Sequence, residues 1–308
     1  MAFTAKDVQA LREKTGVGMM DCKKALVESD GDMDKAIDIL REKGLASAAK
    51  KSSRVAAEGV VAAYSDGKSG ALLEVNCETD FVAKGEPFVN LANKIVKTVV
   101  VEKPADVDAL LKTKVVDGEG TVEEAVQEVF LALRENMKVR RFALVDGFVS
   151  TYIHAGGTVG VMVKFDTDEA TAAKAEFAAM GKNIAMQVAA MNPSYLDEAS
   201  VPAEVLEKEK AILVAQMKED PKMANKPDAV LNKIVEGKIS KYYKENCLVC
   251  QEFVRGDLFE GSVDGYIKSV AKTLGAEIKA VSFVRYEKGE GIEKKTEDFA
   301  AEIASMIK

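Results

Sequence analysis

The residues best suited to chemistry in this chain are four cysteines, a single histidine and many carboxylates, and their spacing decides what they could do. Cys247 and Cys250 form a Cys-x-x-Cys pair, a spacing used by redox centres and by zinc sites. A zinc site needs two further ligands, and a redox pair of the thioredoxin type opens a helix that follows a strand. Neither context is evident around the pair, so we interpret both cysteines as free thiols.

His154 is the only histidine, so a catalytic triad or a multi-histidine metal site would have to be built around one imidazole. It follows an apolar segment and precedes Ala-Gly-Gly, which favours a place in a hairpin or an interface. The Asp and Glu residues are numerous, but none has a spacing that specifies acid and base roles better than a solvated face does. The sequence therefore gives no support for an enzyme, and it indicates neither a bound metal nor a cofactor.

Residues 67–69 have the Gly-Lys-Ser order that ends a phosphate-binding loop. The earlier glycine that such a loop requires is replaced by Ala62, and the sequence that follows has the pattern of a strand instead of a helix. We therefore interpret this segment as the turn of a hairpin.

Composition and charge narrow the class of protein. With 308 residues, 47% of them hydrophobic and 30% charged, the chain can form about two or three packed units. Its net charge of -7 gives no basic field for a phosphate backbone, so nucleic acid is not expected as a direct partner. The start of the chain lacks a signal or transit pattern, and no apolar run reaches the roughly eighteen residues of a membrane span. We predict a cytoplasmic protein with reduced thiols and no membrane contact.

The first part of the chain is predicted to form three helices. Thr4 and Asp7 have the spacing of a capping box, and residues 15–18 break the helix that follows. A second helix carries an apolar face, and Asp32 caps a third helix, for which Gly44 is the predicted C-terminal stop. The polar segment after it, with Lys50 and Lys51, is the predicted linker. We therefore expect a three-helix domain over residues 1–52.

The rest of the chain contains a degenerate internal repeat, in which two strand-like stretches recur in the same order. Each copy has the pattern of a β-hairpin that leads into a helix. We therefore predict two similar α+β subdomains, which we place at residues 53–140 and 141–280. The matching strand segments are 58–64 with 146–152 and 70–76 with 160–166, and the helices follow at 87–100 and 170–191.

Each copy is expected to close with a further helix and strand. In the first copy these are an amphipathic helix at 122–137 and a strand at 139–145. In the second copy they are a helix near 263–274 and a strand near 278–286. An acidic and apolar helix from about residue 296 ends the chain, in a C-terminal module that we place at residues 281–308.

The second copy also carries a helical hairpin, predicted as an insertion over about residues 194–245. Pro202 and Pro227 each stand at the first turn of a long charged helix, and residues 223–226 form the tip between them. Arms of roughly eighteen residues at 1.5 Å per residue would project on the order of 25 Å. Such a projection suggests recognition, with a structural role as the alternative. The predicted seam is Val205, Leu206, Ile212 and Leu213 on the first arm and Leu231, Ile234, Val235 and Ile239 on the second.

The polar connection at residues 78–83 places an aromatic ring beside a carboxylate, where the chain leaves an apolar strand. Aromatic residues next to strand ends usually belong to the core, so the pattern alone favours Phe81 as an anchor for its loop. The same segment, however, reads Thr-Asp-Phe-Val-Ala from residue 79, which is a signature block of the elongation factor Ts family.

The chain resembles the elongation factor Ts family from about residue 3 to residue 308. The two most specific blocks are residues 79–83 and 11–26. Gln187 and Cys250 depart from the family pattern, and since many members have a histidine in place of Gln187, no partner contact is carried over to its helix. Three further blocks in the family's order are residues 152–155, 189–193 and 289–295.

The resemblance implies an α+β fold: a UBA-like three-helix domain, then a duplicated core with a protruding antiparallel helical hairpin, and a C-terminal helix. It also implies a non-enzymatic guanine-nucleotide exchange factor for elongation factor Tu, which it would bind in both the GDP-bound and the nucleotide-free form. A protein-binding module without exchange activity is the alternative that the sequence leaves open.

The resemblance also implies which residues contact the partner. Phe81 would enter the partner near its magnesium site and Asp80 would help to fix the loop, while Thr79 and Val82 would complete the segment. His154 would be a further contact from the core. An apolar loop of the first domain would also face the partner, with plain core packing as the alternative interpretation, and its residues are Val17, Gly18, Met19 and Met20.

Overall fold

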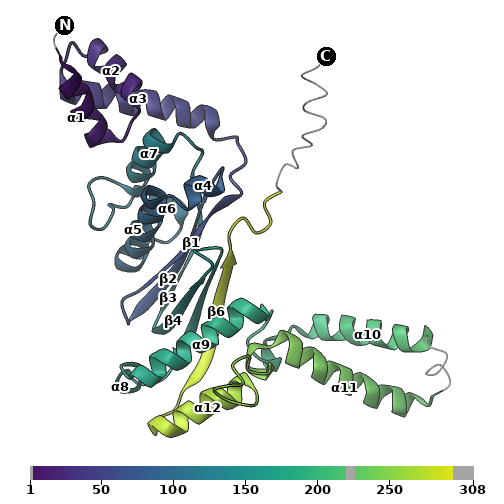
Figure 1. Ribbon diagram of the computed structural model, residues 1–308. Coiled ribbons are helices and arrows are strands. Elements are labelled where there is room, and N and C mark those ends of the chain that lie inside the picture. Colours follow the sequence, from purple (N-terminus) through teal and green to yellow (C-terminus); the bar gives the residue numbers. More distant parts are fainter. Residues whose placement is uncertain (1–2, 220–225, 294–308) are drawn as a thin grey trace.

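Two three-stranded antiparallel sheets lie face to face at the centre of the molecule, and helices cover the outer face of each (Figure 1). The computed structural model describes residues 3–219 and 226–293. Most of the predicted hairpin tip and the whole of the helix predicted from about residue 296 lie outside these ranges. Over the two ranges, no helix combines the length and the apolar character needed to cross a membrane. The mixture of helix and sheet confirms the predicted α+β class.

Three helices form the N-terminal domain, as predicted: α1 (Ala5–Thr15), α2 (Met19–Glu28) and α3 (Met33–Lys51). The predicted capping box is present, because the Thr4 hydroxyl accepts from the Asp7 amide and the Asp7 carboxylate accepts from the Thr4 amide. The helices pack around one small core. Its buried members are Val8, Leu11, Val17, Cys22, Ala25, Leu26, Ala36, Leu40 and Leu131.

The predicted end of the third helix at Gly44 is wrong, because α3 continues to Lys51. A tertiary contact explains the glycine: a side chain at position 44 would collide with Leu131 on α7 (Val122–Leu133). Gly44 therefore allows two helices to approach closely and does not end one. For the same reason Lys50 and Lys51, predicted as linker, belong to α3.

The first sheet has the order β1-β2-β3, and its middle strand is buried along its whole length. Between β1 and β2 the Asp66 side chain accepts from the amides of Lys68 and Ser69, so the Gly-Lys-Ser segment forms the predicted hairpin turn. The strands are β1 (Glu58–Ser65), β2 (Ser69–Cys77) and β3 (Lys138–Asp146). The helices packed on the sheet, besides α7, are α4 (Asp80–Ala83), α5 (Glu86–Glu102) and α6 (Val107–Lys112).

The second sheet repeats the first, which confirms the predicted duplication of the core. Its order is β4-β5-β6, and both middle strands shift register at matching places, at Glu74/Val75 in β2 and at Lys164/Phe165 in β5. The single helix predicted over 170–191 is two helices, α8 and α9, just as α4 precedes α5. The strands are β4 (Phe148–His154), β5 (Val159–Asp166) and β6 (Lys279–Glu287), and the helices are α8 (Glu169–Ala172), α9 (Ala175–Met191) and α12 (Val263–Leu274).

Glycines allow the two sheets to pack closely against each other. A side chain at Gly70 on β2 would collide with Val149 on β4, and a side chain at Gly160 on β5 would collide with Val61 on β1. The apolar layer between the sheets is therefore thin and tightly filled. Its fully buried members are Val61, Leu72 and Met162.

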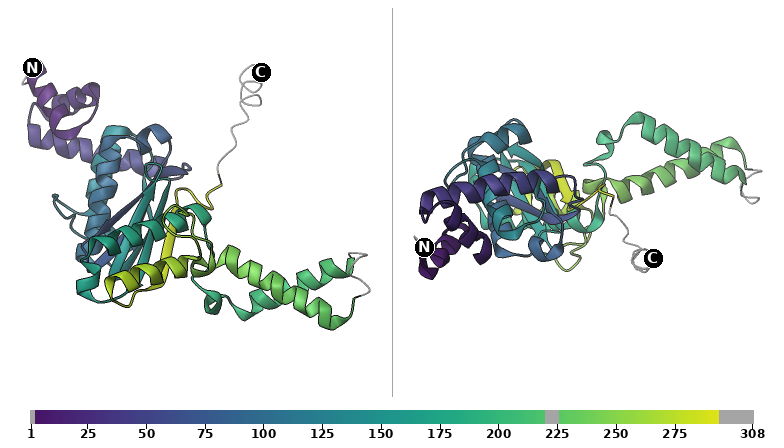
Figure 2. Two further views of the ribbon diagram at one scale, coloured as in Figure 1. Left: turned by 60° about the horizontal axis from the view of Figure 1, so that its bottom comes forward. Right: turned by 90° about the horizontal axis from the view of Figure 1, so that it is seen from above.

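The helical hairpin projects from the body beside the second sheet, as predicted (Figures 1 and 2). It consists of α10 (Ala203–Glu219) and α11 (Asp228–Asn246), flanked in sequence by the short helices η1 (Glu198–Ser200) and η2 (Leu248–Cys250). Ile212 was placed wrongly in the seam, since its side chain is 41% exposed. The buried seam is Met217, Leu231, Val235 and Ile239, edged by Leu206, Leu213, Val214, Ile234 and Tyr243.

Two of the predicted domain boundaries fall inside strands. The boundary between residues 140 and 141 lies within β3, which pairs with β2 on both sides of that point. The boundary between residues 280 and 281 lies within β6, which pairs with β5 on both sides of it. Because a paired strand is one structural unit, we propose that the two subdomains end after β3 and after β6.

Candidate functional site

Phe81 lies in the single turn of α4, directly beyond the end of β2, and its side chain points away from the core. It is 84% exposed, the highest value among the large apolar side chains that the structure places on the surface. The interpretation of Phe81 as a core anchor is therefore wrong. An exposed aromatic ring on a short helix is typical of contact surfaces. The ring is not buried when this chain folds, so its burial in a partner would stabilise the complex.

The other side of α4 is fixed to the body. The Thr79 hydroxyl caps the helix by accepting from the Val82 amide at 3.3 Å. Val82 packs at the edge of the core under the first sheet, and Ala83 is buried in it. The predicted segment thus divides into two parts, with Phe81 exposed and its neighbours Thr79 and Val82 shaping the turn.

Asp80, the carboxylate beside the exposed ring, is paired with the residue that follows α4. Its Oδ2 accepts from Lys84 Nζ at 2.6 Å, and this hydrogen bond holds the pKa of Asp80 below its ordinary value. The pair is exposed to solvent, so it contributes little to stability. Asp80 therefore stays charged and available at the surface next to Phe81.

Glu135, which the sequence analysis did not single out, holds the start of α4. Its Oε2 accepts from the amides of Glu78 at 3.2 Å and Thr79 at 2.9 Å. Its Oε1 accepts from the Thr79 hydroxyl at 2.6 Å. In return, Glu78 Oε1 accepts from the Asn136 amide at 2.7 Å, so the α4 segment and the turn between α7 and β3 bind each other reciprocally.

The chain segment after β6 crosses the first sheet near α4. Glu74, fully buried on β2, accepts from the Gly289 amide at 2.7 Å, from Arg140 at 2.9 Å and from Arg141 at 2.6 Å. Burial alone would raise the pKa of Glu74, but these donors outweigh it and hold the pKa below its ordinary value. Lys288 pairs with Glu58 at the start of β1, which completes the attachment.

The predicted contact loop of the N-terminal domain is only partly on the surface. Met20 is 64% exposed and Met19 is 45% exposed, and Gly18 beside them is open to solvent. Val17 has no exposed surface and belongs to the three-helix core, so the alternative of core packing holds for this residue. Val27, 57% exposed on the same helix as the methionines, is an apolar surface residue that the motif did not include.

His154 ends β4 and is exposed at the β4–β5 turn. Its Nδ1 lies 3.0 Å from the Tyr152 hydroxyl. In the same turn the Gly157 carbonyl accepts from the Val61 amide of β1 at 2.8 Å, which ties the turn to the first sheet. His154, Met20 and Phe81 lie on three different elements, β4, α2 and α4.

Cys247 and Cys250 are both free thiols, as interpreted from the sequence. Burial raises the pKa of Cys247 to about 12, and it also raises the pKa of the partly exposed Cys250. A thiol with a raised pKa is a poor nucleophile, because the thiolate is the reactive form. No group of three or more possible metal ligands occurs within residues 3–219 and 226–293. Gln187, which departs from the family pattern, is buried and hydrogen-bonded to Gln251.

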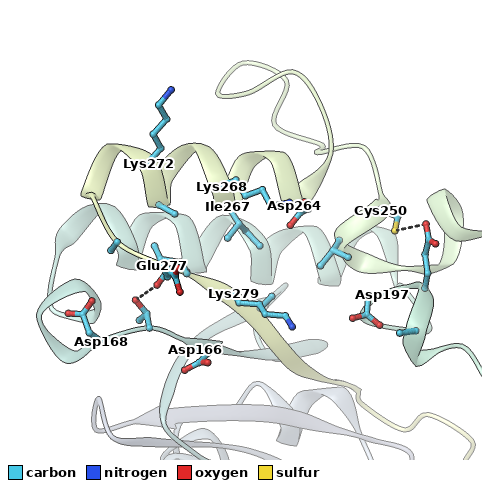
Figure 3. A pocket seen from close by; sticks show the side chains of 18 residues that line it. Asp166, Asp168, Asp197, Cys250, Asp264, Ile267, Lys268, Lys272, Glu277 and Lys279 are labelled. Carbon is cyan, nitrogen blue, oxygen red and sulfur yellow. Dashed lines mark hydrogen bonds and ion pairs between the residues drawn. The ribbon is translucent and has the colours of Figure 1, made fainter.

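A groove of about 1170 Å³ lies between α12 and the start of β6, and its rim carries several carboxylates (Figure 3). Asp168 caps α8, and the Thr171 hydroxyl and amide hold the pKa of Asp168 below its ordinary value, the opposite of what a general acid needs. Asp264 is paired with Lys268 at 2.6 Å. The groove contains none of the residues predicted for the site, and Asp197, like Asp168, caps a short helix.

Comparison with known proteins gives one consistent match. The model of the family "Elongation factor TS" matches residues 78–290. "Elongation factor Ts" of Clostridium tetani is 48% identical, over 99% of this chain and 99% of the relative. "Elongation factor Ts" of Clostridium botulinum is 48% identical over 99% of this chain and 98% of the relative, and that of Clostridium kluyveri is 47% identical over 99% of both.

Proposed function

We propose that this chain, which belongs to the elongation factor Ts family and is therefore a translation elongation factor, promotes the release of GDP from elongation factor Tu. The observation that carries the proposal is the placement of Phe81. The ring is 84% exposed, yet the helix turn that holds it is capped, clamped and packed on the body. A ring held ready in this way can enter a partner without first ordering its own backbone.

The proposed mechanism is displacement of the magnesium ion that holds GDP in the partner. The ion neutralises much of the phosphate charge, so a ring that disturbs its surroundings weakens the retention of GDP. We assign the intrusion to Phe81 and a contact beside it to Asp80. Thr79 and Val82 shape the segment from behind, because their side chains are engaged with the body.

Linkage sets the binding preference that such a factor needs. To promote release, the factor must bind nucleotide-free elongation factor Tu more tightly than the GDP-bound form, and GDP must weaken factor binding by the same ratio. Binding of GTP then displaces the factor. A thousandfold acceleration requires about 4 kcal/mol of barrier lowering. Truncation of a buried interface aromatic costs about 2 to 4 kcal/mol, so a wider contact must supply the rest.

We propose two further contacts for this wider surface. The first is the exposed apolar patch of the N-terminal domain, formed by Gly18, Met19 and Met20. Val17 is left out, because contact with it would require the domain to open. The second is His154 at the β4–β5 turn, an exposed side chain at the end of an anchored hairpin.

The other parts of the proposal follow from the same role. The chain binds a partner and changes the affinity of that partner for its nucleotide, so we propose that it catalyses no reaction of its own. The net charge of -7 supports a protein partner over direct contact with nucleic acid or an anionic membrane. A translation factor of this kind acts in the cytoplasm, where we place it.

The test is the release of fluorescent GDP from purified elongation factor Tu into excess unlabelled GDP. We expect the wild-type chain to accelerate GDP release. The acceleration by Phe81→Ala should be at least about tenfold smaller, which corresponds to about 1.4 kcal/mol less lowering of the barrier to release. Leu258→Ala is the matched control, since Leu258 is a 50% exposed apolar residue of the second subdomain. Binding of wild-type protein without acceleration would contradict the proposal and favour a binding module.

A further inference from the structure

We propose that Glu135 is a positioning residue for Phe81: it fixes the turn of α4 so that the aromatic ring is held outward before a partner binds. This inference rests on the proposed function, and it assigns a role in that function to a residue outside the signature segment. Glu135 itself would not touch the partner's nucleotide or metal, because its carboxylate is engaged with Glu78 and Thr79.

The carboxylate satisfies the N-cap amide of α4, which the short helix cannot satisfy alone, and also the amide of the residue before it. The first amides of any helix lack partners within it, and α4 is a single turn of four residues. An isolated turn of this length is not stable, because one helical hydrogen bond does not offset the ordering of its residues. Glu135 accepts from two amides and one hydroxyl just before the turn, all between 2.6 and 3.2 Å.

The Glu135 carboxylate, which we call the clamp of α4, is itself held in place by neighbouring elements. Glu135 follows Arg134, which ends α7 in the left-handed conformation with φ 61°. The Arg134 carbonyl accepts from Lys51 of α3, and the Arg134 guanidinium pairs with Asp21 of α2 at 3.0 Å. The position of the carboxylate is therefore set by α7 and by the N-terminal domain together. A displacement of that domain can reach Phe81 through this residue and through Glu78, which pairs with Arg54 at 3.3 Å.

The duplicated subdomain supplies an internal comparison. There α8 stands where α4 stands in the first copy, with Asp168 as its cap in place of Thr79. The residue at the position of Phe81 is Ala170, and the residue at the position of Glu135, in the turn between α12 and β6, is Ala276. The copy without an exposed ring also lacks a carboxylate clamp, and there the Thr167 hydroxyl donates to the Glu277 carbonyl at 2.8 Å.

The second copy shows that the fold can form this turn without the clamp. The carboxylate of Asp168 accepts from the amide and the hydroxyl of Thr171, at 2.9 Å and 2.7 Å, and so closes its own turn. In the first copy the Thr79 hydroxyl caps α4, and the carboxylate is that of Glu135, which lies far from Thr79 in the sequence. The geometry thus points to a role in holding Phe81 and not to a requirement of the fold.

The expected effect is on the rate of release more than on binding. Without Glu135 the turn of α4 can fray, and Phe81 then occupies its outward position for only part of the time. The maximal rate falls with that occupancy, while the contacts of the N-terminal domain and of His154 still support binding. Phe81→Ala removes the ring altogether, so loss of the clamp should add nothing further to that variant.

The experiment compares Glu135→Ala with wild type in the fluorescent GDP assay, each with and without Phe81→Ala. We expect Glu135→Ala to lower the maximal release rate about tenfold, to change the half-saturating concentration of the factor less than about threefold, and to have no effect in the Phe81→Ala background. Glu119→Ala, at an exposed loop carboxylate, is the control and should match wild type. A maximal rate equal to wild type, or the same loss in both backgrounds, would overturn the assignment.

A second measurement separates this inference from the proposed function. Amide hydrogen exchange of the free protein at Glu78 and Thr79 should become at least about tenfold faster in Glu135→Ala, while β2 amides stay protected. If wild type does not accelerate GDP release, the proposed function fails, whatever the exchange result. If release is accelerated but these amides exchange equally in both proteins, the positioning role fails and the proposed function stands.

Discussion

At the scale of single residues, exposure separates apolar side chains that the sequence pattern treats alike. Val17 and Met20 stand in one motif, yet Val17 has no exposed surface and Met20 is 64% exposed. Phe81 follows an apolar strand, as core aromatics often do, but is 84% exposed. The direction of each side chain depends on how the short turn around it packs, and the turn packs on elements distant in the sequence.

The signature residues of the site could be identified from the sequence, but their clamp could not. Residues 79–83 form a recognisable block, and Thr79 has the position and the side chain of a helix cap. Glu135 is separated from Thr79 by the whole of α5, α6 and α7. Nothing in its own neighbourhood distinguishes it from a solvated carboxylate, because its partners are backbone amides and the hydroxyl of another segment.

The cysteines give a prediction at this scale. Burial raises the pKa of both Cys77 and Cys247 to about 12, with the nearby Glu135 carboxylate adding to the shift of Cys77. Since the thiolate is the reactive form, we expect both cysteines of the folded protein to be alkylated at least about a hundredfold more slowly than a free thiol at about pH 8. Mass spectrometry after timed iodoacetamide treatment measures this, with the urea-unfolded chain as control. Rapid labelling of folded Cys77 would contradict it.

At the scale of elements, helix starts were predictable and helix ends were less so. The caps at Thr4 and Asp32 act within one turn of their own helix, so local sequence encodes them. Past residue 44, α3 packs against α7, and its last residue, Lys51, donates to the Arg134 carbonyl at the end of α7. Gly44 has the signature of a helix stop, but it serves the approach of Leu131, and the helix continues past it.

The helical hairpin allows a prediction about local stability. Leu231 is buried in the seam between α10 and α11, and it belongs to the apolar cluster of the hairpin. Leu231→Ala should therefore destabilise the hairpin by about 2 to 3 kcal/mol while leaving the two sheets intact. Amide exchange in α10 and α11 should become faster, and exchange in β2 and β5 should not change.

Ile212 supplies the matched control for the hairpin. It lies on α10 but is 41% exposed. Ile212→Ala should therefore change the free energy of hairpin opening, as measured by amide exchange, by less than about 0.5 kcal/mol. Equal effects of the two substitutions would show that the hairpin is not held by the seam described here. A loss of protection in β2 would show that it is coupled to the core.

At the scale of the whole molecule, the duplication could be predicted and its asymmetry could not. The repeated strand and helix patterns indicated two similar subdomains, and both sheets share their order and their register shift. The crossing of residues 287–290 over the first sheet has no sequence signal, because it depends on the buried Glu74 and on arginines from β3. The first copy alone carries the exposed ring and its clamp.

The buried cluster around Glu74 predicts a dependence of stability on pH. The pKa of Glu74 is held below its ordinary value in the folded chain. Its contribution to stability is therefore present above the unfolded pKa of about 4.3 and is lost as pH falls through the folded pKa. Glu74→Gln should cost about 3 kcal/mol at neutral pH, because it leaves Arg140 and Arg141 without their buried partner.

The measurement for Glu74 is urea unfolding of wild type and Glu74→Gln at neutral pH and near pH 3. We expect the difference in the free energy of unfolding to shrink at the lower pH, since the wild-type carboxylate is then increasingly protonated. Glu102→Gln, at an exposed carboxylate at the end of α5, is the control. A difference that stays constant over this range would show that the charge of Glu74 does not stabilise the fold.

The most direct test of magnesium displacement by Phe81 is the rate of GDP release from elongation factor Tu with and without magnesium, for wild type and Phe81→Ala. We expect wild type to exceed the variant at least about tenfold in magnesium, and the two to come within about twofold after EDTA removes the ion. The ring then has no metal site left to disturb. A gap of the same size in EDTA would contradict magnesium displacement by Phe81.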